Sequence, residues 1–226
     1  MKNGILKYGF ADGVTAFSTT REAKLPFPVV QAHQVHGDRI ALITDPETTR
    51  DELEGIDALI TATPGIAIGA RTADCVPVLL YDPVGKTIAA IHSGWRGTVK
   101  RISAETVSAM GDAFGTVPSD LLAVIGPSIG PDSFQVGAEV AQQFSSAGFP
   151  MREIMTDEGE RTPGTMRGGL HIDLWKANRI VLEGAGILPG NIFLSGIDTY
   201  LDPDFYSARR EGTQCGRNIN AIRLER

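Results

Sequence analysis

Residues 73–92 read ADCVPVLLYDPVGKTIAAIH, which is two apolar runs on either side of a segment rich in turn-forming residues. This pattern predicts a β-hairpin. If the DPVG segment forms the turn, Tyr81 pairs with Lys86, and counting back along both strands sets Cys75 directly opposite His92. Directly opposed residues have Cβ atoms about 4.5–5.5 Å apart on one face of a sheet.

A thiol and an imidazole at that separation suit two kinds of chemistry. The pair can hold a zinc or copper ion, because both metals accept sulfur and imidazole nitrogen as ligands. Alternatively, Cys75 can act as a nucleophile with His92 as its base. Asp74 adjoins the cysteine and is a candidate catalytic acid–base, or an acceptor that orients a ligand.

His36 is a further candidate ligand. It lies in the segment QVHG, where the glycine indicates a turn that presents the imidazole from a loop. The two other histidines, His33 and His171, are expected to be ordinary surface or hydrogen-bonded residues.

Four arginines are candidates for binding the phosphate or carboxylate of a substrate, because guanidinium forms forked hydrogen bonds with both groups. Arg71 and Arg96 flank the cysteine–histidine pair, whereas Arg209 and Arg210 occur together in the segment FYSARR. Trp95 is a candidate stacking surface for a planar ligand.

The composition favours one soluble domain spanning residues 1–226. The chain is 42% hydrophobic and 21% charged, which is typical of a globular protein, and no apolar run approaches the ~20 residues of a membrane span. Its net charge of −6 argues against nucleic-acid binding. Two cysteines form no disulfide framework, and the N-terminus has no secretory pattern, so we expect a reducing cytoplasmic setting.

The order of apolar runs predicts a mixed sheet with helices. We expect strands at residues 57–61, 65–69, 121–125, 191–195 and 218–224, besides the hairpin. We expect helices at residues 98–114, 138–147 and 172–186, and an exposed loop at 151–169. Because strands and helices do not alternate regularly, the fold class is α+β or mixed α/β.

Several segments together resemble the signature blocks of the bacterial laccase-domain family, whose members are variously labelled polyphenol oxidase, purine nucleoside phosphorylase and peptidoglycan editing factor. The matching segments are QVHG (34–37), TADCVPV (72–78), HSGWRGT (92–98), IGPSIG (125–130), FQVG (134–137), DLWKANR (173–179) and FYSARR (205–210). They extend over most of the chain.

The resemblance implies a single domain in which two mixed sheets pack between helices, similar to a cysteine-hydrolase toxin fold. It also implies a zinc ion held by His36, Cys75 and His92. The implied activity is phosphate-dependent cleavage of adenosine, inosine and methylthioadenosine, together with adenosine deamination. An alternative family role is an amidase that removes a wrong L-serine from a UDP-linked cell-wall precursor.

Three further interpretations remain open at this stage. A copper-dependent laccase is disfavoured, because four histidines cannot ligate the four coppers of a multicopper oxidase, although copper can occupy the triad in vitro. A metal-free cysteine hydrolase would use Cys75 and His92. A binding protein would close the zinc site with Asp74 or Asp198. Asp198 stands where relatives of this family often carry cysteine, so the chain has no second thiol for a redox role at that position.

Overall fold

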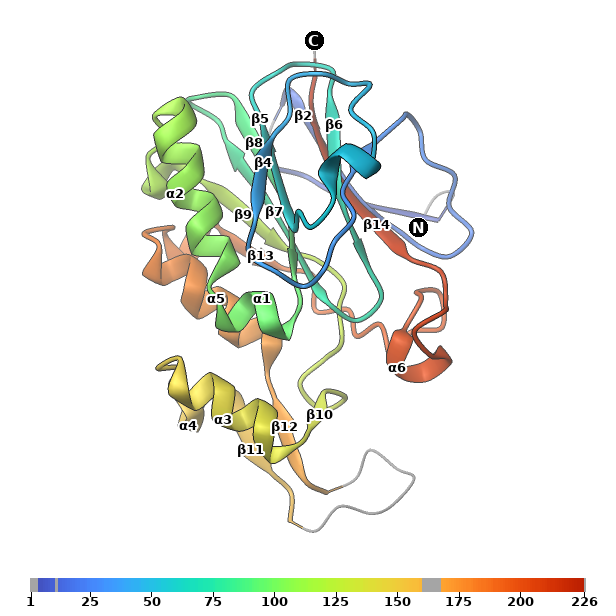
Figure 1. The fold of residues 1–226 in the computed structure, drawn as a ribbon, viewed down its shortest axis with the longest axis vertical. Coiled ribbons are helices and arrows are strands. Elements are labelled where there is room, and N and C mark those ends of the chain that lie inside the picture. The colour runs from blue at the N-terminus through green and yellow to red at the C-terminus, as the bar shows by residue number, and fades with distance from the viewer. Residues whose placement is uncertain (1–3, 11, 160–167, 226) are drawn as a thin grey trace.

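The computed structural model describes residues 4–10, 12–159 and 168–225. Two large mixed sheets form its centre (Figure 1). The six-stranded sheet has, in spatial order, β13 (Ile192–Leu194), β9 (Leu122–Ile125), β7 (Val76–Asp82), β8 (Thr87–Ser93), β5 (Ala58–Thr61) and β4 (Ile40–Leu42). The five-stranded sheet has the order β1 (Ile5–Tyr8), β2 (Val14–Thr19), β14 (Asn218–Leu224), β6 (Ala67–Thr72) and β3 (Val30–Gln31).

Helices and a small sheet complete the described part of the chain. The antiparallel small sheet has the order β10 (Gln135–Val136), β12 (Leu170–Ile172) and β11 (Met155–Asp157). The helices are α1 (Trp95–Val99), α2 (Ile102–Phe114), α3 (Ala138–Ser146), α4 (Met151–Ile154), α5 (Leu174–Gly184) and α6 (Ala208–Glu211). Short 3-10 helices cover Asp51–Leu53, Pro118–Asp120 and Pro189–Asn191.

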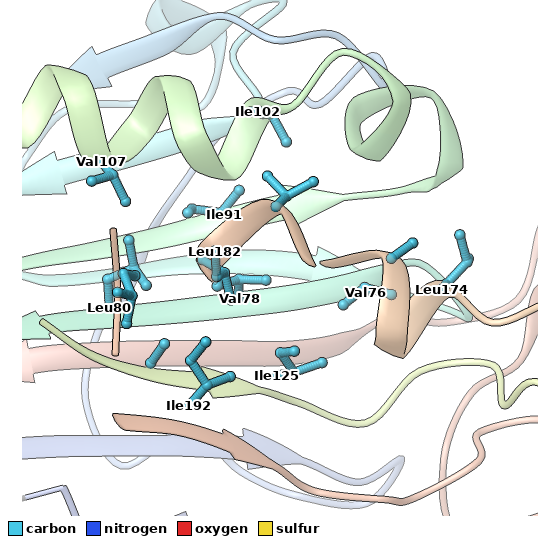
Figure 2. Close-up of a cluster of buried hydrophobic side chains, with 14 of the residues drawn as sticks. Val76, Val78, Leu80, Ile91, Ile102, Val107, Ile125, Leu174, Leu182 and Ile192 are labelled. Carbon is cyan, nitrogen blue, oxygen red and sulfur yellow. The ribbon is translucent and has the colours of Figure 1, made fainter. Parts of the chain in front are cut away.

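The central hairpin β7–β8 is buried on both faces and separates two hydrophobic cores. One set of its side chains, such as Val78 and Ile91, packs against α2 and α5 (Figure 2). The alternate set, such as Leu79 and Ala90, packs against the five-stranded sheet. Two-sided burial explains why both strands read as continuous apolar runs rather than as alternating patterns.

The hairpin exists as predicted, but its register was predicted wrongly. Tyr81 pairs with Ile88 and His92 pairs with Pro77, so Cys75 lies just beyond the end of the ladder instead of opposite His92. The cause is the Asp82 side chain, which accepts hydrogen bonds from the backbone N–H groups of the next residues in the turn, at 2.9 and 2.8 Å. An aspartate that caps a turn in this way lies at its first position, so the turn comes one residue later than the composition suggested, and each residue of the first strand faces a partner two residues further along the second.

Most predicted elements are confirmed with small shifts at their ends. The helix expected at 98–114 is two helices, because Arg101 adopts a left-handed conformation with φ of 62° between them. The helix expected at 172–186 is α5, and Asp173 caps it by accepting a hydrogen bond from the backbone N–H of Lys176 at 2.8 Å.

One expectation differs from the structure, and the structure adds elements that the sequence did not predict. The loop expected at 151–169 contains α4 and β11, and its residues 160–167 lie outside the described part. The small sheet and the N-terminal hairpin β1–β2 had no clear signal in the sequence. Helices cover one side of the paired sheets, whereas Phe27 and Val29 from a loop pack on the outer face of the five-stranded sheet.

The mixed α+β class with several mixed sheets is thus confirmed. Within the residues that the structure describes, no helix combines the length and apolar character needed to traverse a bilayer.

Candidate metal centre and its cleft

His36, Cys75 and His92 meet at one place in the fold. Their ligand atoms all lie within 4.8 Å of one another, and the two imidazole rings meet edge to face with centroids 4.8 Å apart. His92 is buried near the end of β8, Cys75 is half-buried just before β7, and His36 is exposed on the loop between β3 and β4. The structure therefore brings together the three side chains that the sequence nominated as metal ligands.

Asp57 positions two of these three residues through hydrogen bonds, and the sequence did not predict this role. Its carboxylate hydrogen-bonds the Nδ1 atom of the His92 ring at 2.7 Å. The same carboxylate accepts backbone N–H groups from Val35, His36 and Gly37 at 3.2, 2.9 and 2.7 Å. A carboxylate on the second ring nitrogen fixes the orientation and basicity of a ligating imidazole.

The loop that carries His36 is held in an unusual shape. The backbone of His36 has a φ of 62°, in the left-handed region that non-glycine residues rarely adopt. Three successive N–H groups aimed at one carboxylate offset the cost of this conformation. As a result, the histidine loop and the β8 histidine are tied to the same buried anion.

The charges of Cys75 and His92 stabilise each other. Burial disfavours the thiolate, but the positive charge of His92 and hydrogen bonds from His36 and His92 lower the pKa of Cys75 to about 6. Burial likewise disfavours the imidazolium, yet the Cys75 thiolate and the Asp57 carboxylate raise the pKa of His92 to about 9. Burial opposes ionisation of Asp57 as well, but its bonds to His92 and Gly37 lower its pKa.

The donor set suits a metal such as zinc. Two imidazoles and a thiolate are ligands that zinc prefers, and three protein ligands leave a position open for substrate. Gly94 lies directly against the group: a Cβ there would be 3.0 Å from Sγ of Cys75 and 3.1 Å from Cδ2 of His36. The lack of a side chain at this position lets the three donors approach one another.

The three donors line a cleft of about 750 Å³. Apolar side chains of Trp95, Ile129 and Phe134 form part of its wall. Four arginines also line the cleft: Arg50, Arg71, Arg209 and Arg217. A volume of this size suits a small molecule with both an apolar ring and an anionic group.

Asp74 also lines the cleft, but its carboxylate is engaged within the protein. It accepts the hydroxyl of Thr199 at 2.8 Å and the backbone N–H of Arg209 at 2.7 Å. The residue has a φ of 84°, which turns the chain between β6 and β7. These contacts connect the start of α6 to the residue next to Cys75, and a catalytic role for Asp74 stays a prediction.

The four predicted arginines have different surroundings. Arg71 and Arg209 line the cleft. Arg96 is exposed and is not part of the cleft lining; its guanidinium carbon lies 4.4 Å from the centroid of the Trp95 ring. Arg210 is also absent from the lining, because its guanidinium donates to several backbone carbonyls, including those of Thr199 and Tyr200 at 2.8 and 2.7 Å.

Comparison with known proteins identifies the family to which the chain belongs. The family model of the multi-copper polyphenol oxidoreductase laccase matches residues 15–225, so the chain belongs to this family. The resemblance drawn from the sequence blocks is thereby confirmed.

Individual relatives carry more specific names. The chain is 41% identical over 211 residues to the purine nucleoside phosphorylase of Bacteroides thetaiotaomicron, covering 90% of this chain and 76% of that protein. It is 41% identical over 201 residues to adenosine deaminase RL5 from an unknown prokaryotic organism, covering 86% and 74% respectively. The solved structure of the Bacillus licheniformis hypothetical protein YfiH matches with a TM-score of 0.88 at 28% identity, over 99% of this chain and 97% of that chain.

Proposed function

We propose that this chain is a zinc-dependent enzyme that cleaves adenosine, inosine and methylthioadenosine with phosphate and also deaminates adenosine. The observation that carries the proposal is the gathering of His36, Cys75 and His92 on the wall of a cleft that also holds arginines and aromatic rings. Relatives named as purine nucleoside phosphorylase and adenosine deaminase support the same substrate class.

An open metal site favours catalysis over simple binding. Bound zinc supplies a Lewis acid that polarises an oxygen atom of water or substrate. Asp74 is engaged by Thr199 and Arg209, and the Asp198 carboxylate accepts the hydroxyl of Ser133 at 2.6 Å and the backbone N–H of Tyr200 at 2.9 Å. Both candidates for a closing fourth ligand thus have other partners.

The remaining side chains of the cleft have roles in positioning. In phosphorolysis a phosphate oxygen bonds to the anomeric carbon of ribose while the bond to the purine nitrogen breaks, and the departing base takes a proton. Arg71 would hold the phosphate, because arginine binds it through two parallel hydrogen bonds, and Arg209 lies on the same cleft wall, where it can contact the substrate. Trp95 and Phe134 offer faces on which a planar base can stack.

The distribution of histidines argues against a multicopper centre. Two of the chain's four histidines belong to the triad. His33 pairs with Glu54 at 2.5 Å, and His171 is buried in the small sheet. A copper ion in the triad would therefore be a single ion and not the cluster of a laccase. Since both cysteines are free thiols, we also propose a reducing cytoplasmic location.

The decisive experiment incubates purified protein with adenosine and phosphate. Adenine and ribose 1-phosphate are measured together with inosine and ammonia, before and after chelation and after zinc is added back. We expect products from both reactions, loss on chelation, and recovery with zinc. Absence of all four products from the zinc-loaded protein would refute the proposal.

A metal-free cysteine hydrolase is the second candidate, and one observation favours it. Cys75, His92 and Asp57 form a thiol–imidazole–carboxylate series, with the thiol pKa lowered to about 6. On this alternative, chelation leaves activity intact and iodoacetamide abolishes it. On the zinc proposal, chelation is sufficient to abolish activity.

A further inference from the structure

Three arginines converge where neighbouring strands of the five-stranded sheet end. Arg71 is in β6, next to its last residue, and Arg217 immediately precedes β14, whose Ile219 pairs with Arg71. Strand β3 pairs with β6 on the other side, and Arg50 donates from Nε to the carbonyl of Ala32, just after β3, at 3.2 Å. All three arginines line the cleft that holds the metal ligands.

None of the three guanidinium groups has a carboxylate partner in the described part of the chain. Neutral oxygens orient them instead. Arg71 donates from Nη1 to the side chain of Gln31 at 3.2 Å, and Arg217 donates to the carbonyls of Gly216 and Thr213, each at 2.9 Å.

The backbone at Arg71 is fixed as well. The Gln34 amide donates to the Arg71 carbonyl at 2.9 Å and accepts the Arg71 N–H at 2.8 Å. Burial lowers the pKa of Arg71, and the positive charges of Arg50 and Arg217 lower it further. The fold thus brings three like charges close together without compensating them, which destabilises the protein unless an anion binds.

We propose that Arg50, Arg71 and Arg217 form a phosphoryl-binding subsite of the cleft. Its ligand is a phosphoryl dianion, brought either as inorganic phosphate or as the terminal phosphate of a nucleotide. A planar, forked donor matches this group, and three such donors match its charge better than that of a carboxylate. The subsite deepens the proposed function by locating the phosphate, but anion binding there does not depend on any nucleoside reaction.

The test measures phosphate binding by calorimetry in the absence of nucleoside. Arg71→Gln and Arg217→Gln are compared with the parent and with Arg152→Gln, which removes an exposed arginine of α4 outside the cleft lining. We expect each subsite variant to weaken phosphate binding about tenfold or more, since a charge-assisted pair is lost. The Arg152 variant should bind phosphate like the parent.

Two further measurements separate the subsite from the metal and from a structural role. Binding that persists after chelation is not at the zinc. Without phosphate, Arg71→Gln should melt at the same temperature as the parent or higher, because it relieves repulsion among like charges. A purely structural arginine would instead lower the melting temperature and leave phosphate affinity unchanged, which would overturn the proposal.

Competition identifies the source of the phosphoryl group. If AMP or UDP displaces phosphate from the parent and itself binds Arg71→Gln more weakly than the parent, the subsite takes the phosphate of a nucleotide; if neither displaces it, the ligand is inorganic phosphate. Parental phosphate affinity in both subsite variants overturns the subsite whatever the catalytic result. Tight phosphate binding without nucleoside cleavage refutes the proposed function and leaves the subsite standing.

Discussion

The three candidate metal ligands and the three arginines lie on the same cleft, but their charges are compensated to different extents. At the metal centre, the Asp57 carboxylate compensates His92 and holds the His36 loop. At the arginine subsite, Arg71 has two cationic neighbours and an amide oxygen as its partner. The charge of His92 is compensated by a carboxylate of the protein itself. The charges of the three arginines are compensated only when an anion is bound.

The two regions differ in whether the protein itself supplies the opposite charge. A compensated centre keeps its geometry with or without its ligand, because hydrogen bonds already satisfy its atoms. An uncompensated cluster of cations has affinity for anions built into it and lowers the stability of the free protein. Substitutions in the two regions should therefore differ in their effects on stability as well as on binding.

Cys75→Ser should have the largest effect, because it removes a ligand from the compensated centre. Serine hydroxyl is a far poorer zinc ligand than thiolate, so we expect zinc to be lost and adenosine turnover to fall by more than about 100-fold. The fold should persist, since a chain of 226 residues does not depend on zinc for its core. Elemental analysis, circular dichroism and turnover check this.

Cys215→Ser is the matched control for zinc content, because it changes the other free thiol of the chain. It should retain one zinc per chain. Turnover at the parental rate in Cys75→Ser would show that Cys75 is not part of the active site. A collapsed fold in this variant would show that the zinc has a structural role.

Asp57→Asn tests the compensation itself. The amide keeps the shape but removes the charge, so we expect zinc affinity to fall about 10–100-fold, the usual effect of losing a carboxylate partner of a ligating histidine. Competition with a chromogenic chelator measures the affinity. Asp38→Asn is the control, because Asp38 forms an exposed pair with Lys100 at 3.4 Å. Equal affinities in the two variants would contradict the assigned role.

The thiol should titrate early in chelated protein. Because His92 and His36 stabilise the thiolate, its fraction rises as pH increases through about 6, whereas a free cysteine ionises near pH ~8.5. Iodoacetamide rates on chelated Cys215→Ser protein should therefore show a midpoint near pH 6. A midpoint near that of free cysteine would mean that the histidines do not stabilise the charge.

Arg96→Ala should have the smallest effect. The sequence nominated Arg96 as a phosphate ligand, but its guanidinium stacks on Trp95 outside the cleft lining. We expect the KM for phosphate to change by less than about twofold, as for an ordinary surface residue. A loss comparable to that of Arg71→Gln would show that Arg96 contributes to phosphate binding.

Much of the site was predictable because its ligands belong to short, recognisable segments. The hairpin and its cysteine–histidine pair followed from apolar runs and a turn, even though Asp82 shifted the register. The pair still meets, since Asp74 with its φ of 84° bends the chain beyond the end of the ladder. The prediction that Cys75 and His92 are neighbours was therefore correct although the predicted strand register was wrong.

Partners that depend on distant strand pairing were not predictable. Asp57 immediately precedes the apolar strand β5, and no spacing signal in the sequence links it to His36 or His92. Arg50 and Arg217 come to Arg71 only because β3, β6 and β14 are neighbours in one sheet, which no local pattern indicates. Tertiary topology, and not propensity, decides these contacts.

The hydrogen bonds of Asp57 to His92 and to the His36 loop affect which metal a purified sample of this protein carries. A site whose donors are already oriented accepts an ion without folding around it, so folding does not select the metal. Selection then falls to supply and intrinsic affinity, and copper exceeds zinc in the latter. Protein purified from cells grown in copper-rich medium should carry copper, whereas protein from cells grown with zinc should carry zinc. The two preparations of the same polypeptide would then catalyse different reactions.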